Sequence, residues 1–489
     1  MIVPFYSILR GENNNISPLI QPSDQPSMLN GCNNTYKVGA LLKDTGYSII
    51  GAQIQDNKSV LGLFNFIQEP GTEKMLATID DSTSDDTQLF YSTGAGWTEA
   101  TAAETAWANF AGINVEMESF IGYCFFVGYG ATDGFLPVGS LTGTTFSTST
   151  NVTSMPKAKY IRRYRDRLYV ANCQIGATNY PYRVYFSSVP SAGAITWTQA
   201  TDLFDVDYSD EITGLAENWD RLVVFTEYKA YFYDQAQRKK VWDYGCSSHR
   251  TIKNSGPYMI WANYDGVWLS TGGQPQNIAG EIMSFIKAGS PRTWFAEIID
   301  EEYWLFLGSV TVDGVSYANC CKIYNIPLNA WRTREFGDPI KTFARYNSSG
   351  KQYLWAGDND GKVYQKGKYS DASLISSDNT AAIPSNFELA PIHLQSIDKL
   401  KALKAIIAYA DRSQGLNLQA RVIDRNARVL MPYRPLGQLK SFVNSFDVNI
   451  PEGVFIQIAG SESSTLPYWS FYGFALDVEL ASRVLKSKI

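Results

Sequence analysis

The scarcity of histidine limits the chemistry that this chain could perform. Its 489 residues include only two histidines, His249 and His393, which lie in segments that we assign to different domains. A Ser-His-Asp triad or a two-histidine metal site needs such side chains close to their partners. The sequence also contains no P-loop and no dinucleotide-binding fingerprint. We therefore expect no catalytic residue, no cofactor and no enzymatic activity.

Adjacent carboxylates occur three times, at Asp80-Asp81, Asp85-Asp86 and Asp300-Glu301-Glu302. Glycoside hydrolases use two carboxylates at a controlled separation. Sialidase-type propellers also carry a Ser-x-Asp-x-Gly-x-Thr-Trp turn, whose nearest matches here are residues 92–98 and 191–198. Both matches lack the Asp. We interpret the acidic groups as solvated hairpin turns.

Asp358-Asn359-Asp360-Gly361 is similar to the opening of a calcium-binding loop. The bidentate Glu expected at the twelfth loop position is absent. An Asp-Gly step after an apolar strand is typical of a tight hairpin, because Gly accepts a positive φ. We predict a hairpin here and no metal site in the chain.

Three arginines, Arg163, Arg165 and Arg167, alternate along the sequence. Alternate residues of a strand share one face, and Asp166 would point to the other. The row is our candidate contact with DNA phosphates or with an acidic partner. The alternative is an arginine row that protects a solvated sheet edge.

The composition favours β-sheet and argues against tight DNA binding. Aromatic residues make up 14% of the chain, with 30 Tyr, and Gly occurs 38 times. Aromatic side chains suit pleated surfaces, and Gly suits turns. The net charge is −6, whereas a protein that grips DNA through its phosphates is normally basic. Any contact with DNA is therefore expected to be local or repulsive.

Targeting and cysteine patterns point to assembly in a cytoplasm. No apolar run reaches the roughly 18 residues of a membrane helix, and residues 1–10 do not read as a signal peptide. The six cysteines include no Cys-x-x-Cys pair and do not form a disulfide framework. We expect reduced, buried thiols and no membrane insertion.

A repeated unit organises the middle of the chain. Two apolar strands are followed by a small residue and a tryptophan, as at Trp97, Trp197, Trp242 and Trp331. Weaker copies keep the strand pair with an Asp-Gly turn between its strands. The period of about 40–50 residues is that of propeller blades.

The repeat predicts an all-β chain with a β-propeller of about six or seven blades over residues 55–370. Side chains expected to be buried between blades are Leu168, Leu222, Trp261 and Leu305. Two short helices are expected, at 102–111 and 281–287. The alternative is an irregular sandwich, because short strands at regular spacing fit both folds.

The two ends of the chain have different patterns. Residues 1–54, with Pro18, Pro22 and Pro26, are expected to form an extended N-terminal arm. A polar stretch from 368 to 385 reads as a linker. Beyond it, residues 385–489 have longer strands without the tryptophan unit, and we predict a C-terminal β-sandwich.

The N-terminal arm carries a family resemblance. Its Asn30-Gly31 step and its residues 39–47, Gly-Ala-Leu-Leu-Lys-Asp-Thr-Gly-Tyr, resemble the opening of bacteriophage tail proteins of the nozzle and packaged-DNA-stabilisation kind. Further segments that look like parts of this family are 220–227, 265–268, 272–286 and 471–476. The chain is shorter than the long nozzle proteins, which carry inserted domains.

The resemblance implies a structural virion protein of the tail. It would form a homo-oligomeric ring, expected to be a hexamer, around the DNA exit channel, retain the genome and pass it at ejection. Its partners would be the portal, adaptor or other tail proteins, after assembly in the bacterial host cytoplasm. The alternatives are a carbohydrate-binding or carbohydrate-cleaving propeller on a phage fibre or cell surface, and a scaffold for host proteins. The carbohydrate function requires an acidic or aromatic cluster at a propeller mouth.

Overall fold

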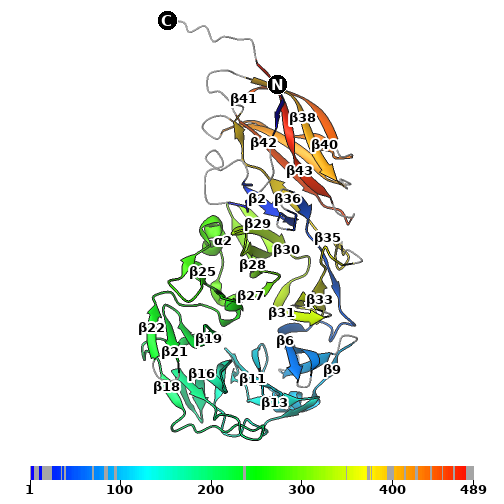
Figure 1. Cartoon of the computed structure of the whole chain (residues 1–489). Helices are drawn as coiled ribbons and strands as arrows, with labels where there is room; N and C mark the ends of the chain where they lie inside the picture. Colours follow the sequence, from blue (N-terminus) through cyan, green and yellow to red (C-terminus); the bar gives the residue numbers. More distant parts are fainter. Residues whose placement is uncertain are drawn as a thin grey trace.

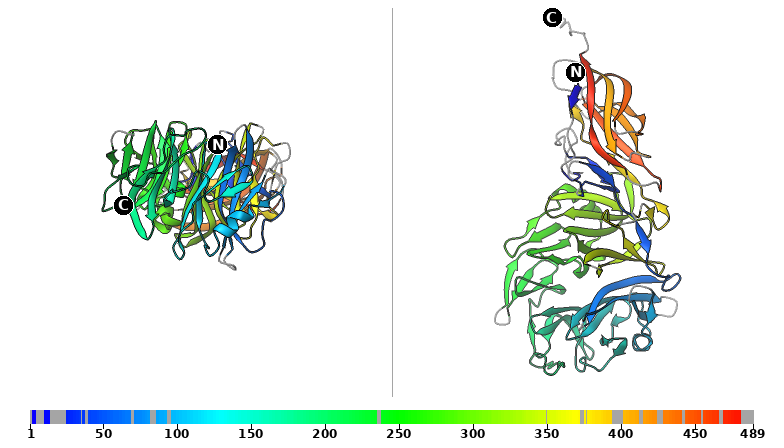
Figure 2. Two further views of the ribbon diagram at one scale, coloured as in Figure 1. Left: turned by 90° about the horizontal axis from the view of Figure 1, so that it is seen from below. Right: turned by 45° about the vertical axis from the view of Figure 1, so that its right-hand side comes forward.

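The computed structural model shows a β-propeller with a β-sandwich attached to one side of the ring (Figure 1). It describes all residues except 1, 5–9, 14–24, 35, 38–39, 69–70, 82–85, 93–95, 235–237, 349, 372–374, 376, 394–400, 412–414, 424–427, 441–442, 454, 466–468 and 481–489. The propeller part is seen from its edge on the left of Figure 2. None of the described helices has the length and apolar character needed to cross a bilayer.

The described strands form seven blades, each an antiparallel sheet of at least four strands. From the ring axis outward, the first blade consists of β6 (Ser59–Gln68), β7 (Thr72–Asp81), β8 (Asp86–Ser92) and β9 (Thr98–Glu99). The second consists of β10 (Asn114–Phe120), β11 (Tyr123–Gly130), β13 (Gly139–Thr142) and β14 (Thr145–Ser147), with β12 (Gly134–Phe135) beside β11. The third consists of β15 (Lys157–Tyr164), β16 (Arg167–Ile175), β17 (Thr178–Phe186) and β18 (Leu203–Asp205).

The next three blades follow the same plan. The fourth blade consists of β19 (Ile212–Asn218), β20 (Arg221–Thr226), β21 (Ala230–Tyr233) and β22 (Arg238–Trp242). The fifth consists of β23 (Lys253–Ser255), β24 (Tyr258–Asn263), β25 (Gly266–Ser270) and β26 (Gln276–Asn277). The sixth consists of β27 (Phe295–Ile299), β28 (Glu302–Val312), β29 (Val315–Asn325) and β30 (Ala330–Glu335). The predicted propeller is confirmed, with the higher of the two expected blade numbers.

The seventh blade closes the ring with a strand from the start of the chain. Its strands β31 (Ile340–Ser348), β32 (Lys351–Asp358) and β33 (Val363–Lys366) are followed outward by β5 (Tyr47–Ile49), in which Ser48 is opposite Gln365. The chain therefore hydrogen-bonds its last blade to the segment that leads into its first. The expected linker contributes a short hairpin to this sheet, β34 (Ser377–Asp378) and β35 (Ala381–Ala382).

Apolar side chains fill the spaces between neighbouring blades. Leu168, Leu222, Trp261 and Leu305 are each fully buried, in clusters that draw residues from two adjacent blades. This placement was predicted. The repeated tryptophans mark the outer part of the blades: Trp242 ends β22 and Trp331 lies in β30.

Both expected helices are present, and both are short. The first is α1 (Thr101–Ala106), and the second is α2 (Met283–Ala288), preceded by a 3-10 turn, η3 (Gly280–Ile282). Two further 3-10 turns are η2 (His249–Thr251) and η4 (Pro291–Thr293). Phe285 and Ile286 of α2 are buried against the sixth blade, as their helical spacing predicts.

The sandwich is built from both ends of the chain. One sheet has the order β3 (Cys32–Asn33), β4 (Leu41–Lys43), β43 (Ser470–Leu480), β38 (Lys401–Asp411) and β41 (Val443–Gly453), with β1 (Ile2–Pro4) beside β43. The other has the order β2 (Met28–Asn30), β36 (Ser385–Glu388), β42 (Phe455–Glu462), β39 (Asn417–Ile423) and β40 (Val429–Gln438), with β37 (Ile392–His393) beside β42.

The N-terminal residues that the structure describes are therefore integrated into both parts instead of forming a separate arm. Four of their strands belong to the sandwich and the fifth to the last blade. Asn30 of β2 also pairs in parallel with Thr333 of β30, so the sheet of the sixth blade continues into the sandwich. Sequence periodicity could not reveal this, because each of these strands has only two or three residues.

Gly46 lies where the chain passes from the sandwich to the last blade. A Cβ at Gly46 would come within 1.9 Å of the backbone oxygen of Ser377. We predict that Gly46→Ala lowers the free energy of unfolding by at least about 1–3 kcal/mol, the usual cost of overpacking. Urea denaturation followed by circular dichroism measures this change. Gly273→Ala is the matched control, because nothing lies within 4 Å of its added Cβ; an equal loss in both variants would contradict the prediction.

Candidate functional site

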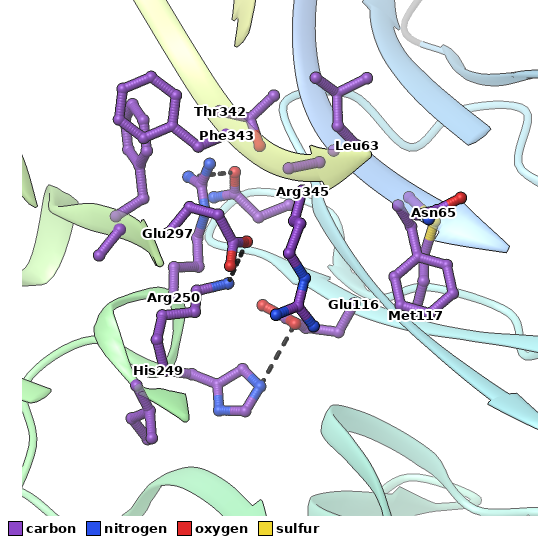
Figure 3. A pocket seen from close by; sticks show the side chains of 18 of the residues that line it. Leu63, Asn65, Glu116, Met117, His249, Arg250, Glu297, Thr342, Phe343 and Arg345 are labelled. Carbon is purple, nitrogen blue, oxygen red and sulfur yellow. Dashed lines mark hydrogen bonds and ion pairs between the residues drawn. The ribbon is translucent and has the colours of Figure 1, made fainter. Parts of the chain in front are cut away.

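The innermost strands of all seven blades surround a central cavity of about 380 Å³ (Figure 3). It is lined by charged and amide side chains, among them Asn65, Glu116, His249, Arg250 and Glu297. This is the size of a small-ligand pocket. Duplex DNA could not pass along the axis of a single propeller.

Both ring nitrogens of His249 have partners within the chain. Its Nε2 lies 3.3 Å from a carboxylate oxygen of Glu116, and its Nδ1 accepts a hydrogen bond from the backbone N–H of Leu215 at 3.2 Å. Burial opposes ionisation of Glu116, but His249 and Arg250 outweigh it and lower the pKa of that carboxyl. The histidine therefore connects the second blade to the fourth through two fixed bonds.

Arg250 crosses the cavity and holds further blades together. Its guanidinium donates to Asn114 Oδ1 at 3.0 Å in the second blade and to the backbone oxygen of Lys341 at 2.6 Å in the seventh. Burial lowers the pKa of Arg250 to about 10, while the charge of Glu116 opposes the shift. These bonds give the cavity residues a structural role in closing the ring.

The arginine row does not lie on one strand. Arg163 is near the end of β15, Arg165 is in the turn with φ of 50°, and Arg167 begins β16. The expectation of one shared strand face is therefore wrong. The cause is a hairpin turn at Arg165-Asp166, which contains no Gly to signal it in the sequence.

Two of these arginines have partners within the chain. Arg165 makes two hydrogen bonds to the carboxylate of Asp220, at 2.9 and 2.6 Å. Arg167 donates to the backbone oxygen of Ser187 at 2.8 Å. Contact of the row with DNA or an acidic partner stays a prediction.

The acidic side chains of the turns accept hydrogen bonds from backbone N–H groups. Asp80 accepts a hydrogen bond from the N–H of Gly112 at 2.7 Å, and Asp86 accepts one from Asn109 at 3.0 Å; Asp85 is outside the described residues. Asp358 accepts bonds from the N–H groups of the turn that follows it. Within the described residues, no group of three His, Cys, Asp or Glu side chains could hold a metal ion.

The remaining predicted groups are also accounted for. His249 lines the propeller cavity and His393 lies in β37 of the sandwich, so the two histidines are in different domains, as predicted. The six cysteines are all buried and free. Asp300 pairs with Lys368 at the edge of a second cavity between the last two blades.

Buried ion pairs join the N-terminal segment to both parts of the molecule. Glu12 lies 2.6 Å from Lys322 in the sixth blade, and both side chains are inaccessible to solvent. Lys43 lies 2.7 Å from Glu462 in the sandwich, and this pair is buried as well. We refer to these pairs, together with those of Asp44, as the ionic junction.

Asp44 is the centre of the ionic junction. Its carboxylate lies 3.0 Å from Arg332 Nη1 in the sixth blade and 3.1 Å from Lys366 Nζ in the seventh. Burial would raise the pKa of Asp44, but Lys366 and Arg332 hold it well below its ordinary value of 3.8. Burial lowers the pKa of Lys366 to about 8, against the attraction of Asp44.

Sequence reasoning missed the ionic junction. Asp44 and Arg332 are 288 positions apart, and neither lies in a motif that marks charged pairs. The only signal was indirect, because Lys43 and Asp44 belong to the N-terminal segment that carries the family resemblance.

Comparisons with known proteins add little about function. No protein-family model and no curated protein matches the chain. One similar solved structure is the AfRom2 CNH domain, which is 9% identical over 67% of this chain and 100% of that chain, with a TM-score of 0.40. Another is the Neurospora crassa Pan2 WD40 domain, which is 9% identical over 68% of this chain and 97% of that chain, with a TM-score of 0.37. A third is an exo-beta-1,3-galactanase from Phanerochaete chrysosporium, which is 10% identical over 90% of this chain and 100% of that chain, with a TM-score of 0.26. The propeller assignment stands on the strand order of the chain itself.

Removing the charge of Asp44 should destabilise the protein strongly. Asp44→Asn leaves Lys366 buried without a counter-charge and removes one of the two carboxylates of Arg332, the other being Glu302, which costs about 3–5 kcal/mol. The free energy of unfolding in urea at pH 7 measures this loss. Asp220→Asn is the control, because it breaks an exposed pair that solvent screens, and its loss of stability should be much smaller.

The same variant has a defined pH dependence. Because the folded-state pKa of Asp44 lies below its ordinary value of 3.8, its stabilisation is fully present above that pH and is lost as pH falls through the folded-state pKa. The stability difference between wild type and Asp44→Asn should therefore shrink in acid. A difference that grows below pH 4 would contradict the assignment.

Proposed function

We propose that this protein is a structural component of a bacteriophage tail. Copies of it form a ring, expected to be a hexamer, around the DNA exit channel, which retains the genome and passes it at ejection. The observation that carries the proposal is the position of the resembling segment: Asn30-Gly31 and residues 40–47 lie at the ionic junction and at ring closure. A segment with this role suits a protein that must stay rigid under the pressure of packaged DNA.

The DNA path runs between copies and not through the propeller. The central cavity of about 380 Å³ is crossed by Arg250 and is far too small for a duplex. A net charge of −6 favours passage over binding, because tight phosphate contact needs a basic surface. The neighbours along the tail axis would be portal, adaptor or other tail proteins, joined after assembly in the host cytoplasm.

The sandwich is the proposed contact between copies. Two edge strands, β40 and β41, end its sheets, and β40 exposes Val429 and Leu430, 51% and 58% accessible. Tyr409 and Val443 are cross-strand neighbours that are also exposed. A cyclic ring needs two different surfaces on each copy, and edge strands with exposed apolar side chains readily pair with another chain.

A second candidate function is carbohydrate binding. One observation favours it: aromatic and acidic side chains gather at a cavity between the sixth and seventh blades. The carbohydrate alternative was expected to use a cluster at a propeller mouth, and this cluster lies instead between two blades and the N-terminal segment.

The tail assignment predicts where the protein is found in the virion. Electron microscopy of purified virions, with the protein located by a specific antibody, should place it as a ring on the tail axis. Labelling only of peripheral fibres, in single copies, would reject the ring and favour the carbohydrate-binding alternative.

The sandwich contact can be tested with one charge. We predict that phage carrying Leu430→Asp assemble tails without the ring and lose at least about 90% of infectious particles, because an unpaired charge in an apolar contact costs several kcal/mol. Val189→Asp is the matched control, since Val189 is similarly exposed on the propeller. Equal titres from both variants would exclude β40 as the contact between copies.

A further inference from the structure

A second cavity, of about 570 Å³, opens where the N-terminal segment meets the last two blades. Three parts of the chain build its wall. The N-terminal segment supplies Tyr36 and Asp44, and the sixth blade supplies Trp304 and Arg332. The end of β33 and the residues that follow it supply Lys366 to Ser370. We call it the junction pocket. Its volume is suited to a ligand of one or two sugar rings.

Two buried donors of the junction pocket have no partner among the described residues. They are the indole Nε1 of Trp304, which is 4% exposed, and Nε of Arg332, which is 2% exposed. Trp304, Ile323 and Arg332 form one cross-strand row, so the two donors belong to the same face of the blade. Buried donors in native proteins are normally satisfied, so an acceptor from outside the chain is expected here.

The charges that line the pocket already neutralise one another. Arg332 lies 3.0 Å from Asp44 and 2.8 Å from Glu302, while Lys366 lies 3.1 Å from Asp44. Lys368 is paired with Asp300. The carboxylates, with Glu301, outnumber the cations by four to three. The pocket therefore repels an anion and favours a neutral ligand with acceptor oxygens.

The mouth of the pocket is aromatic and apolar. The ring of Tyr36 stacks on that of Tyr369 with a centroid distance of 4.5 Å, and Tyr36 is 58% exposed. Leu328, 41% exposed, lies at the same cavity. An exposed aromatic face packs well against the C–H groups of a sugar ring, and nearby carboxylates accept hydrogen bonds from its hydroxyls.

We propose that the junction pocket binds a neutral saccharide. Hydroxyl or ring oxygens accept hydrogen bonds from Trp304 Nε1 and Arg332 Nε, the Tyr36 ring covers one face of the sugar, and Asp300 and Glu301 accept from its hydroxyls. The inference does not depend on the proposed tail function, since a virion ring and a free propeller could both carry the site.

Saturation-transfer NMR on the full-length protein tests the site. The probes are D-glucose, D-galactose, D-mannose and N-acetyl-D-glucosamine, each at about 10 mM, because a ligand of this size binds with a Kd of about 1 mM. We expect transfer to at least one probe. Absence of transfer to all four would overturn the proposal.

Variants assign any binding to the pocket. Trp304→Phe keeps a buried ring and removes the donor, and Tyr36→Ala removes the exposed ring; each should weaken binding at least fivefold. Tyr228→Ala, at an exposed tyrosine of the fourth blade, is the control and should bind as wild type does. Circular dichroism verifies that the variants are folded. Unchanged binding in both pocket variants would overturn the proposal.

One acidic probe tests the ligand class. N-acetylneuraminic acid carries a carboxylate and should bind more weakly than the best neutral sugar, because the carboxylates of the pocket are in excess. Tighter binding of the acidic sugar would overturn the assignment to neutral saccharides.

Discussion

Buried charge pairs of the N-terminal segment connect the two parts of this molecule. Lys43 pairs with Glu462 of the sandwich, and the next residue, Asp44, pairs with Arg332 and Lys366 of the propeller. Adjacent residues of an extended chain point in opposite directions, so one short stretch can bind both parts. Such pairs add little net stability, but an unpaired buried charge is costly, and this strongly disfavours any other arrangement.

Ring closure depends on the same stretch. Three residues after Asp44, strand β5 begins at Tyr47 and completes the seventh blade. The hydroxyl of Tyr47 donates to Asp338 at 2.8 Å, and Tyr364 of the blade packs on its ring. Displacing the segment would therefore open the propeller and remove strands from the sandwich together.

The sequence predicts local features well and distant pairing poorly. Asp-Gly turns and repeated tryptophans such as Trp242 mark units that fold from nearby residues, so they predict the blades. The ionic junction joins residues that are hundreds of positions apart, and Lys43 and Asp44 lie at the end of a three-residue strand, which has no periodicity. The unpartnered donors of Trp304 and Arg332 depend on packing and become visible only in three dimensions.

Native-state hydrogen exchange tests the central claim that the ionic junction couples propeller and sandwich. In wild type, amides of β30 in the sixth blade and β36 in the sandwich should exchange with the same opening free energy. In Lys43→Met, which leaves Glu462 of the sandwich unpaired, protection should fall by a similar factor in both strands. Loss of protection in β36 alone, with β30 unchanged, would contradict the account.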